Sequence, residues 1–267
     1  MIEVPMMERE EQQKTCANML AIASGKGGVG KTWLSVTLAQ ALARGGKRVL
    51  LFDGDLGLAN VDIQLGLHPS NDLGGVLDGS YELKEATTHH DAGGFDVIAG
   101  RSGTGSLANI PAVRLKQLMD DLTALAPSYD RVILDLGAGL ERTVRDLAAV
   151  ARTTLVVATD EPTSLTDAYA FIKLAHMQNP QKQKDGADLR VVINMATSPA
   201  EGERTYATLL KACESFLKIS PPLASVIRRD SKVKDAIRHQ VPLLIRHPNS
   251  QAASDVEALA GRLNGKT

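Results

Sequence analysis

A glycine-rich loop between an apolar run and a helical pattern constrains this chain more than any other feature of its sequence. Residues 24–32 read Ser-Gly-Lys-Gly-Gly-Val-Gly-Lys-Thr and match the pattern G-x-x-x-x-G-K-[S/T]. The apolar residues 19–23 precede the loop, and the helical pattern of residues 31–43 follows it. Glycines let the backbone wrap closely around an anion, and the N–H groups that open a helix favour negative charge. The motif therefore predicts a strand, a phosphate-binding loop and a helix in succession.

The polar groups of this loop have distinct expected roles. Lys31 would place a positive charge on the β- and γ-phosphate oxygens, and the Thr32 hydroxyl would ligate Mg²⁺. The backbone groups expected around the phosphates belong to Gly27, Gly28, Val29 and Gly30. Lys26 is an additional lysine, and it stands too early in the loop to fold back easily onto its own γ-phosphate. The alternatives are a chance match in a glycine-rich turn and, for Lys26, a solvated loop lysine.

Carboxylates follow two of the expected strands. Asp53 and Asp55 come after the strand at residues 48–52, and Asp135 ends the strand at residues 131–134. Ligands of doubly wound sheets bind at the carboxyl ends of strands, so these acids should lie beside the phosphates. We expect Asp53 and Asp135 to hold Mg²⁺ through water, and Asp55 to orient the attacking water. The alternative for the first pair is an Asp-Gly turn with solvated acids. Residues 136–139, Leu-Gly-Ala-Gly, would form a switch loop that senses the γ-phosphate.

The rest of the chain alternates short apolar runs with helical patterns. Further strands are expected at residues 96–99, 154–158, 190–193 and 223–227, and further helices at residues 113–125, 164–177, 204–217 and 250–263. This alternation favours crossover connections and a mainly parallel sheet buried on both faces. We expect one doubly wound α/β domain over residues 18–267, with helices on both faces, of the P-loop NTPase type. Residues 1–17 are polar and predict a flexible N-terminal tail, or alternatively a partner-binding segment that folds on contact.

Composition excludes several other classes of protein. The chain has 267 residues, 43% of them hydrophobic, and a formal net charge of −1, which gives no electrostatic reason to expect general nucleic-acid binding. Its two cysteines, Cys16 and Cys213, are too few for a disulfide framework, a zinc site or an iron–sulfur cluster. No run reaches the roughly 18–20 apolar residues that cross a bilayer, and the N-terminus has no signal-peptide pattern. The expectation is a cytoplasmic protein.

Five segments resemble the MinD/ParA superfamily of deviant Walker A ATPases, and specifically its FlhG (FleN, YlxH) branch. They are the phosphate loop and residues 52–62, 134–139, 160–169 and 248–250. The motifs Gly-Leu-Ala-Asn-Val-Asp at residues 57–62 and Glu-Pro-Thr-Ser at residues 161–164 favour the FlhG branch over ParA in general. The resemblance covers nearly the whole chain from about Met19.

This resemblance implies a slow ATPase that uses ATP and Mg²⁺, and a homodimer with two ATP molecules between facing protomers. Lys26 would act in trans on the partner's nucleotide, together with Lys31 and Asp55 in catalysis. Asn60 would lie near the γ-phosphate, Asn194 would read adenine, and Arg229 and Asp230 would lie beside the base. FlhG-like members control flagellar number and placement, so a protein partner and recruitment to a cell pole or the inner membrane surface are implied.

Two features leave other functions open, and a third argues against membrane targeting. Leu136 stands where the family usually has threonine, which allows a weakly active nucleotide-binding scaffold. A basic region could hold DNA, as in a ParA-type positioner of DNA or another cargo, although a solvated face is the favoured interpretation. Its members are Arg228, Arg229, Lys232, Lys234, Arg238, His239, Arg246 and His247. The last helix has a weakly apolar stripe and no cationic face, so we expect it to pack on the domain and not to target a membrane.

Two further predictions concern local packing. Trp33, directly after Thr32, is expected to pack in the core or at an interface. His89 and His90 have no metal-ligating neighbours in sequence, and a loop surface is predicted for them.

Overall fold

The strands in the described part of the chain all belong to one sheet. The computed structural model describes residues 17–100, 110–178 and 188–265. Its eight-stranded sheet has the order β3-β4-β2-β5-β1-β6-β7-β8. The bounds are β1 Met19–Ser24, β2 Val49–Gly54, β3 Thr87–His90, β4 Phe95–Ile98, β5 Arg131–Ala138, β6 Thr153–Ala158, β7 Asp188–Ala196 and β8 Leu223–Arg228. Neighbouring strands run parallel except β3 and β4, which are antiparallel. The mainly parallel sheet is confirmed, while the predicted tail lies outside the described residues except for Ala17.

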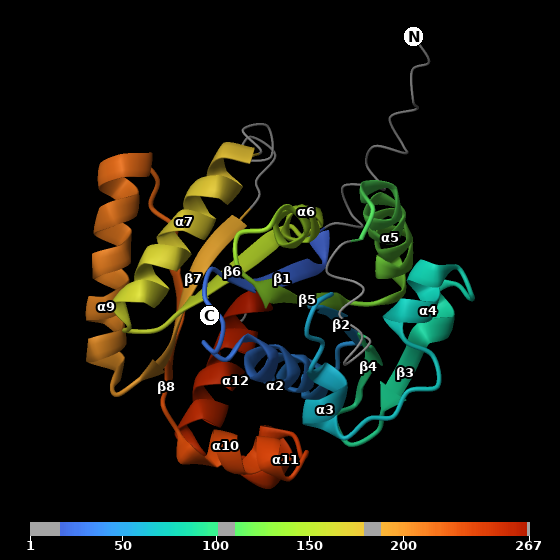
Figure 1. Ribbon diagram of the computed structural model, residues 1–267. Helices are drawn as coiled ribbons and strands as arrows, with labels where there is room; N and C mark the ends of the chain where they lie inside the picture. The colour runs from blue at the N-terminus through green and yellow to red at the C-terminus, as the bar shows by residue number, and fades with distance from the viewer. Residues whose placement is uncertain (1–16, 101–109, 179–187, 266–267) are drawn as a thin grey trace.

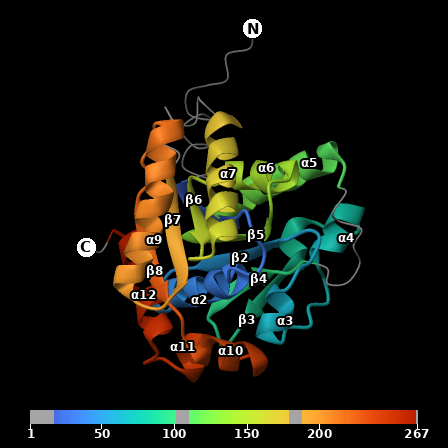
Figure 2. The same cartoon turned by 60° about the vertical axis from the view of Figure 1, so that its left-hand side comes forward.

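Helices cover both faces of this sheet. Figure 1 shows α5, α6, α7 and α9 on one side and α2, α10, α11 and α12 on the other, and Figure 2 shows the same two layers from a second direction. The bounds are α2 Lys31–Arg44, α3 Val61–Leu65, α4 Leu73–Asp78, α5 Ala112–Leu125, α6 Arg142–Val150, α7 Pro162–Gln178, α9 Pro199–Ala212, α10 Ser231–Arg238, α11 Leu243–Arg246 and α12 Gln251–Leu263. Short turns at Leu83–Ala86, Ala126–Ser128 and Cys213–Leu217 complete the described helical segments. The doubly wound α/β fold is confirmed.

The two faces of the sheet build separate hydrophobic clusters. Met19, Ala21 and Ala23 of β1 belong to the cluster under α5, α6, α7 and α9. The intervening Leu20 and Ile22 belong to the cluster under α2 and α12. Because successive side chains of a strand point to opposite faces, a strand covered on both sides needs apolar residues at every position. This requirement explains the uninterrupted apolar runs of the sequence.

The prediction of a loop at His89 and His90 is wrong, and the predicted surface position holds for His89 only. Both residues lie in β3, which forms a hairpin with β4 through the glycine-containing turn at residues 91–94. His90 is buried, and its ring centroid lies 5.4 Å from that of Phe95. His89 faces Asp96 across the hairpin, with 2.6 Å between Nδ1 and Oδ1. The polar Thr-Thr-His-His run hides this strand because only the pairing with β4 makes it extended.

Helix α12 packs on the domain, as the sequence predicts. Ala252, Val256, Leu259 and Ala260 of its stripe are buried in the cluster shared with α2. Among the described helices, none has the length and apolar character needed to cross a bilayer.

Helix α5 offers a matched pair of residues for testing the packing. Leu122 is fully buried, whereas Val113 on the same helix is 79% exposed. Leu122→Ala should lower the free energy of unfolding by about 2–5 kcal/mol, because it removes buried methyl groups and leaves a cavity. Val113→Ala should change that free energy by less than about 0.5 kcal/mol. Urea unfolding of both variants measures the difference, and equal effects would contradict the packing described here.

Candidate functional site

A cleft opens where the strands of the sheet end. It has a volume of about 680 Å³, and its walls come from the glycine-rich loop, the segment after β2, the ends of β5 and β7 and the segment after β8. Ten predicted site residues line it: Gly27, Gly28, Gly30, Lys31, Thr32, Asp55, Asn60, Asn194, Arg229 and Asp230. The remaining four lie outside its lining: Lys26, Val29, Asp53 and Asp135. Segments far apart in sequence thus meet at the edge of the sheet where ligands of such folds bind.

The glycine-rich loop is held open by a side chain from the other half of the chain. Gly30 has φ +89°, and a Cβ added there would lie 2.5 Å from Asn194 Nδ2. Asn194 Nδ2 donates to the Val29 carbonyl at 2.7 Å, and Asn194 Oδ1 accepts from the Met195 N–H at 2.9 Å. Only glycine fits at position 30 because this conformation and this contact both exclude a side chain. Asn194 therefore positions the loop, a role that its predicted contact with adenine did not include.

Lys31 lies inside the cradle formed by the loop. It is 8% exposed, and its Nζ donates to Ser24 Oγ at 2.9 Å. Burial lowers the pKa of Lys31, whereas the charges of Asp135 and Asp55 act to raise it. An amine held in this way carries a positive charge with little water around it, so an anion in the cradle would be bound strongly.

Two buried carboxylates stand side by side behind the cradle. Asp53 and Asp135 are register partners on β2 and β5, and both are essentially inaccessible to solvent. Burial raises the pKa of both acids, and the charge of Asp135 adds to the rise at Asp53. Ser35 Oγ donates to Asp135 Oδ1 at 2.8 Å, and a hydrogen bond with Thr32 also acts to lower the pKa of Asp135. Paired acids of this kind beside a hydroxyl fit a divalent cation, which would relieve their repulsion.

Asp53 and Asp55 also shape the segment that follows β2. Asp53 Oδ2 accepts from the N–H groups of Asn60 and Val61, each at 3.0 Å, at the start of α3. Asp55 Oδ1 accepts from the N–H of Leu58 at 2.9 Å. The two acids therefore tie this segment into a fixed loop beside the cleft, and Asp55 is the one that faces the cleft.

Leu136 does not face the cleft. It is 1% exposed in the cluster under α5 and α6, and its Cδ2 would lie 2.9 Å from a Cβ at Gly54. The residue two positions later, Ala138, lines the cleft instead. The side chain that departs from the family pattern is thus a packing residue of the core.

Lys26 lies beside the cleft against the start of α7. Its Nζ contacts the Glu161 carboxylate and donates to Thr163 Oγ1 at 2.8 Å. The Lys26 side chain retains 33% of its exposure, unlike Lys31. Hydrogen bonding with Lys26, reinforced by its charge, lowers the pKa of Glu161. The two lysines of the loop therefore occupy different environments, one inside the cradle and one at its rim.

The remaining predicted residues lie on the far wall of the cleft. Asn60 precedes α3 and contacts the Leu58 carbonyl through its amide. Asp230 caps α10, because its Oδ1 accepts from the Lys232 N–H at 2.9 Å. Arg229 lies next to it and is exposed.

Sequence reasoning missed several residues that build the site. Ser35, Glu161 and Thr163 have the contacts described above, and Trp33 and Met195 line the cleft. The signal for Ser35 was its position one helical turn after Lys31, which turns its hydroxyl toward the same strand ends. Glu161 and Thr163 belong to the Glu-Pro-Thr-Ser motif, but that motif did not indicate their contact with Lys26, because the contact joins segments more than 130 residues apart.

Comparison with known proteins agrees with this geometry. Residues 20–243 match the family described as the CobQ/CobB/MinD/ParA nucleotide binding domain. The antiactivator FleN of Pseudomonas aeruginosa is 37% identical over 246 residues, which cover 92% of this chain and 86% of that protein. The flagellum site-determining protein YlxH of Helicobacter pylori is 33% identical over 249 residues, covering 92% of this chain and 82% of that protein.

A solved structure shows the same fold. The septum site-determining protein MinD of Pyrococcus horikoshii, in complex with Mg-ADP, superposes with a TM-score of 0.76 at 23% identity, covering 93% of this chain and 96% of that one. The family match spans most of the chain, and the two sequence relatives are each covered over more than four fifths of their length. This chain belongs to the CobQ/CobB/MinD/ParA nucleotide-binding family.

Proposed function

We propose that the chain is a slow ATPase of the FleN/YlxH type that binds ATP with Mg²⁺. The family supplies nucleotide binding, and the glycine cradle around Lys31 with paired acids behind it supports a triphosphate with a divalent cation. Thr32 would ligate the ion directly, and Asp53 and Asp135 would hold its water. When bound, ATP supplies the phosphoanhydride bond that is hydrolysed.

The residues of the cleft would have separate roles in binding and hydrolysing ATP. Lys31 neutralises phosphate charge inside the cradle, where little water screens it. Asp55 faces the cleft with one carboxylate oxygen tied to the backbone, so its other oxygen can accept a proton from a water molecule. Asn194 and Gly30 keep the loop open, and Arg229 and Asp230 border the end of the cleft proposed for the base.

The position of Lys26 is the observation that supports an ATP-dependent dimer. Its amine lies at the rim of the cleft and outside the cradle, against Glu161 and Thr163, which remain exposed. An amine at the rim can reach a nucleotide held by a facing protomer, as an arginine finger does. We propose that Lys26 exchanges its contact with Glu161 for the partner's phosphates when the dimer forms.

Lys26→Ala should abolish the dimer while leaving nucleotide binding intact. The wild type should have the mass of a monomer with Mg-ADP and of a dimer with Mg-ATP, measured by light scattering after size exclusion. Trp33 is the only tryptophan of the chain and lines the cleft, so its fluorescence reports binding separately. Lys26→Ala should keep the wild-type fluorescence titration and remain a monomer with ATP. A variant that still dimerises would refute the role of Lys26.

The cellular role that we propose is control of flagellar number or placement. FleN is named an antiactivator and YlxH a flagellum site-determining protein, and both relatives match along most of their length. The chain would act in the cytoplasm with a protein partner, recruited to a cell pole or the inner membrane surface. Counting flagella in the encoding bacterium with the wild-type and Lys26→Ala alleles tests this role, and identical numbers and positions would count against it.

The two alternative functions receive less support. Four of the eight residues in the basic region face carboxylates of the same chain, since Arg228 pairs with Asp255, and His239, Arg246 and His247 pair with Asp235. These pairs neutralise the charges of Arg228 and Arg246, which weakens the region as a site for DNA phosphates. The weakly active scaffold rested on Leu136, whose side chain lies in the core.

A further inference from the structure

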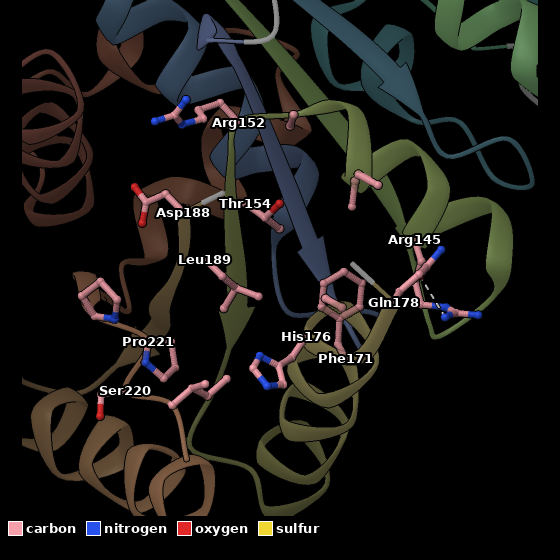
Figure 3. A pocket seen from close by; sticks show the side chains of 16 residues that line it. Arg145, Arg152, Thr154, Phe171, His176, Gln178, Asp188, Leu189, Ser220 and Pro221 are labelled. Atoms are coloured by element: carbon pink, nitrogen blue, oxygen red, sulfur yellow. Dashed lines mark hydrogen bonds between the residues drawn. The ribbon is translucent and has the colours of Figure 1, made fainter. Parts of the chain in front are cut away.

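A second cavity lies at the opposite end of the sheet from the cleft. It has a volume of about 350 Å³ and is lined from α6, α7, the starts of β6 and β7, and the segment before β8 (Figure 3). Leu189, near the start of β7, lines this cavity, whereas Asn194, near the end of the same strand, lines the cleft. Its volume falls in the range of about 300–1,000 Å³ that is usual for ligand pockets.

The walls of this cavity are mostly apolar, and its lining includes two arginines, Arg145 and Arg152, against one acid, Asp188. Phe171, Leu189, Ile219 and Pro221 supply much of the apolar lining. Arg145 is fixed at the rim because it donates to the Leu140 carbonyl at 3.1 Å and to Gln178 Oε1 at 3.0 Å.

Among the described residues, two acidic groups near this rim each pair with another arginine. Asp188 lies 2.6 Å from Arg190, and Asp146 lies 3.2 Å from Arg142. Arg145 and Arg152 therefore leave an excess of positive charge around an apolar cavity, and an acidic, partly apolar segment would complement it.

The N-terminal residues of the chain have this chemistry. Residues 1–16 contain the apolar Met1, Ile2, Val4, Met6 and Met7. They also carry four glutamates against one arginine and one lysine. Methionine side chains are unbranched and adapt to irregular apolar spaces.

The same residues join the fold next to this cavity. Leu20 of β1 pairs with Thr153, directly after Arg152 and directly before Thr154, which both line the cavity. The chain therefore enters the sheet one strand away from the cavity, about 5 Å in the direction of the strand pairing. Sixteen residues can span up to about 50 Å, which is ample for this reach.

We propose that residues 1–16 dock in the cavity of their own chain, with apolar side chains inside it and glutamates against Arg145 and Arg152. The protein would thereby cover an apolar surface on the side remote from the cleft. This docking would not depend on nucleotide binding or hydrolysis in the cleft.

Hydrogen exchange of the full-length protein tests this docking. In the wild type, amides of residues 2–12 should exchange about tenfold more slowly than in a synthetic peptide of residues 1–16. Arg152→Glu should remove that protection, because it places a negative charge against the glutamates. Lys116→Glu on the exposed side of α5 is the matched control and should leave the protection unchanged.

A charge exchange separates docking from misfolding. Combining Arg152→Glu with Glu8→Lys, Glu10→Lys and Glu11→Lys should restore protection that each set of changes alone removes. An unchanged Trp33 fluorescence titration with Mg-ATP shows that each variant is folded. The proposal is overturned if the N-terminal amides of the wild type exchange like the free peptide. Protection that disappears on tenfold dilution would also overturn it, because the occupant would then be the N-terminus of a second copy.

Discussion

Lys31→Ala should lower the affinity for Mg-ATP by at least about 100-fold, because truncating one member of a desolvated charge pair costs about 3 kcal/mol or more. Lys31 supplies the amine inside the cradle and is only 8% exposed. Because the site is buried, water could not replace the lost interaction with the phosphates. Isothermal calorimetry in the presence of Mg²⁺ measures the loss directly.

Two other lysines serve as controls for the loss of affinity in Lys31→Ala. Lys47 is exposed and lies outside the cleft, so Lys47→Ala should bind Mg-ATP as the wild type does. Lys26→Ala, at the rim, should likewise bind with nearly unchanged affinity. Equal losses in Lys31→Ala and Lys47→Ala would show that the cradle is not the nucleotide site.

Asp55→Asn should reduce ATP turnover by about 100-fold or more while leaving ATP binding in place. An amide of the same shape can still accept from the Leu58 N–H, so the loop keeps its form, but it is a poor acceptor for a proton from water. Hydrolysis would return the proposed dimer to monomers, so the variant should remain dimeric with ATP long after the wild type has reverted. Phosphate release and light scattering over the same time course measure both effects.

Asp91 provides the control for this substitution. It is an exposed acid on the turn between β3 and β4, and Asp91→Asn should hydrolyse ATP at the wild-type rate. If Asp55→Asn also kept the wild-type rate, Asp55 would be a loop-shaping residue without a role in proton transfer.

Most of the fold was predictable because its strands are buried on both faces. Such strands must be apolar at every position, so β1, β2, β5 and β6 stand out as continuous runs. β3 was not predictable, since its four residues are polar and become a strand only through pairing with β4. Helix α6 was also missed, because it is short and its apolar face contains only Val144, Leu147 and Ala148.

The sequence alone determined the cradle and the acids beside it. A glycine-rich strand–loop–helix junction has few conformations open to it, and parallel strands bring the acids at their ends to one edge. Tertiary structure alone decided which distant groups touch the loop. Asn194 reaches Val29, Glu161 reaches Lys26, and Leu136 turns into the core and not the cleft. These outcomes depend on strand order and on the face toward which a side chain points. Both are set by packing the whole sheet, so no local pattern of residues encodes them.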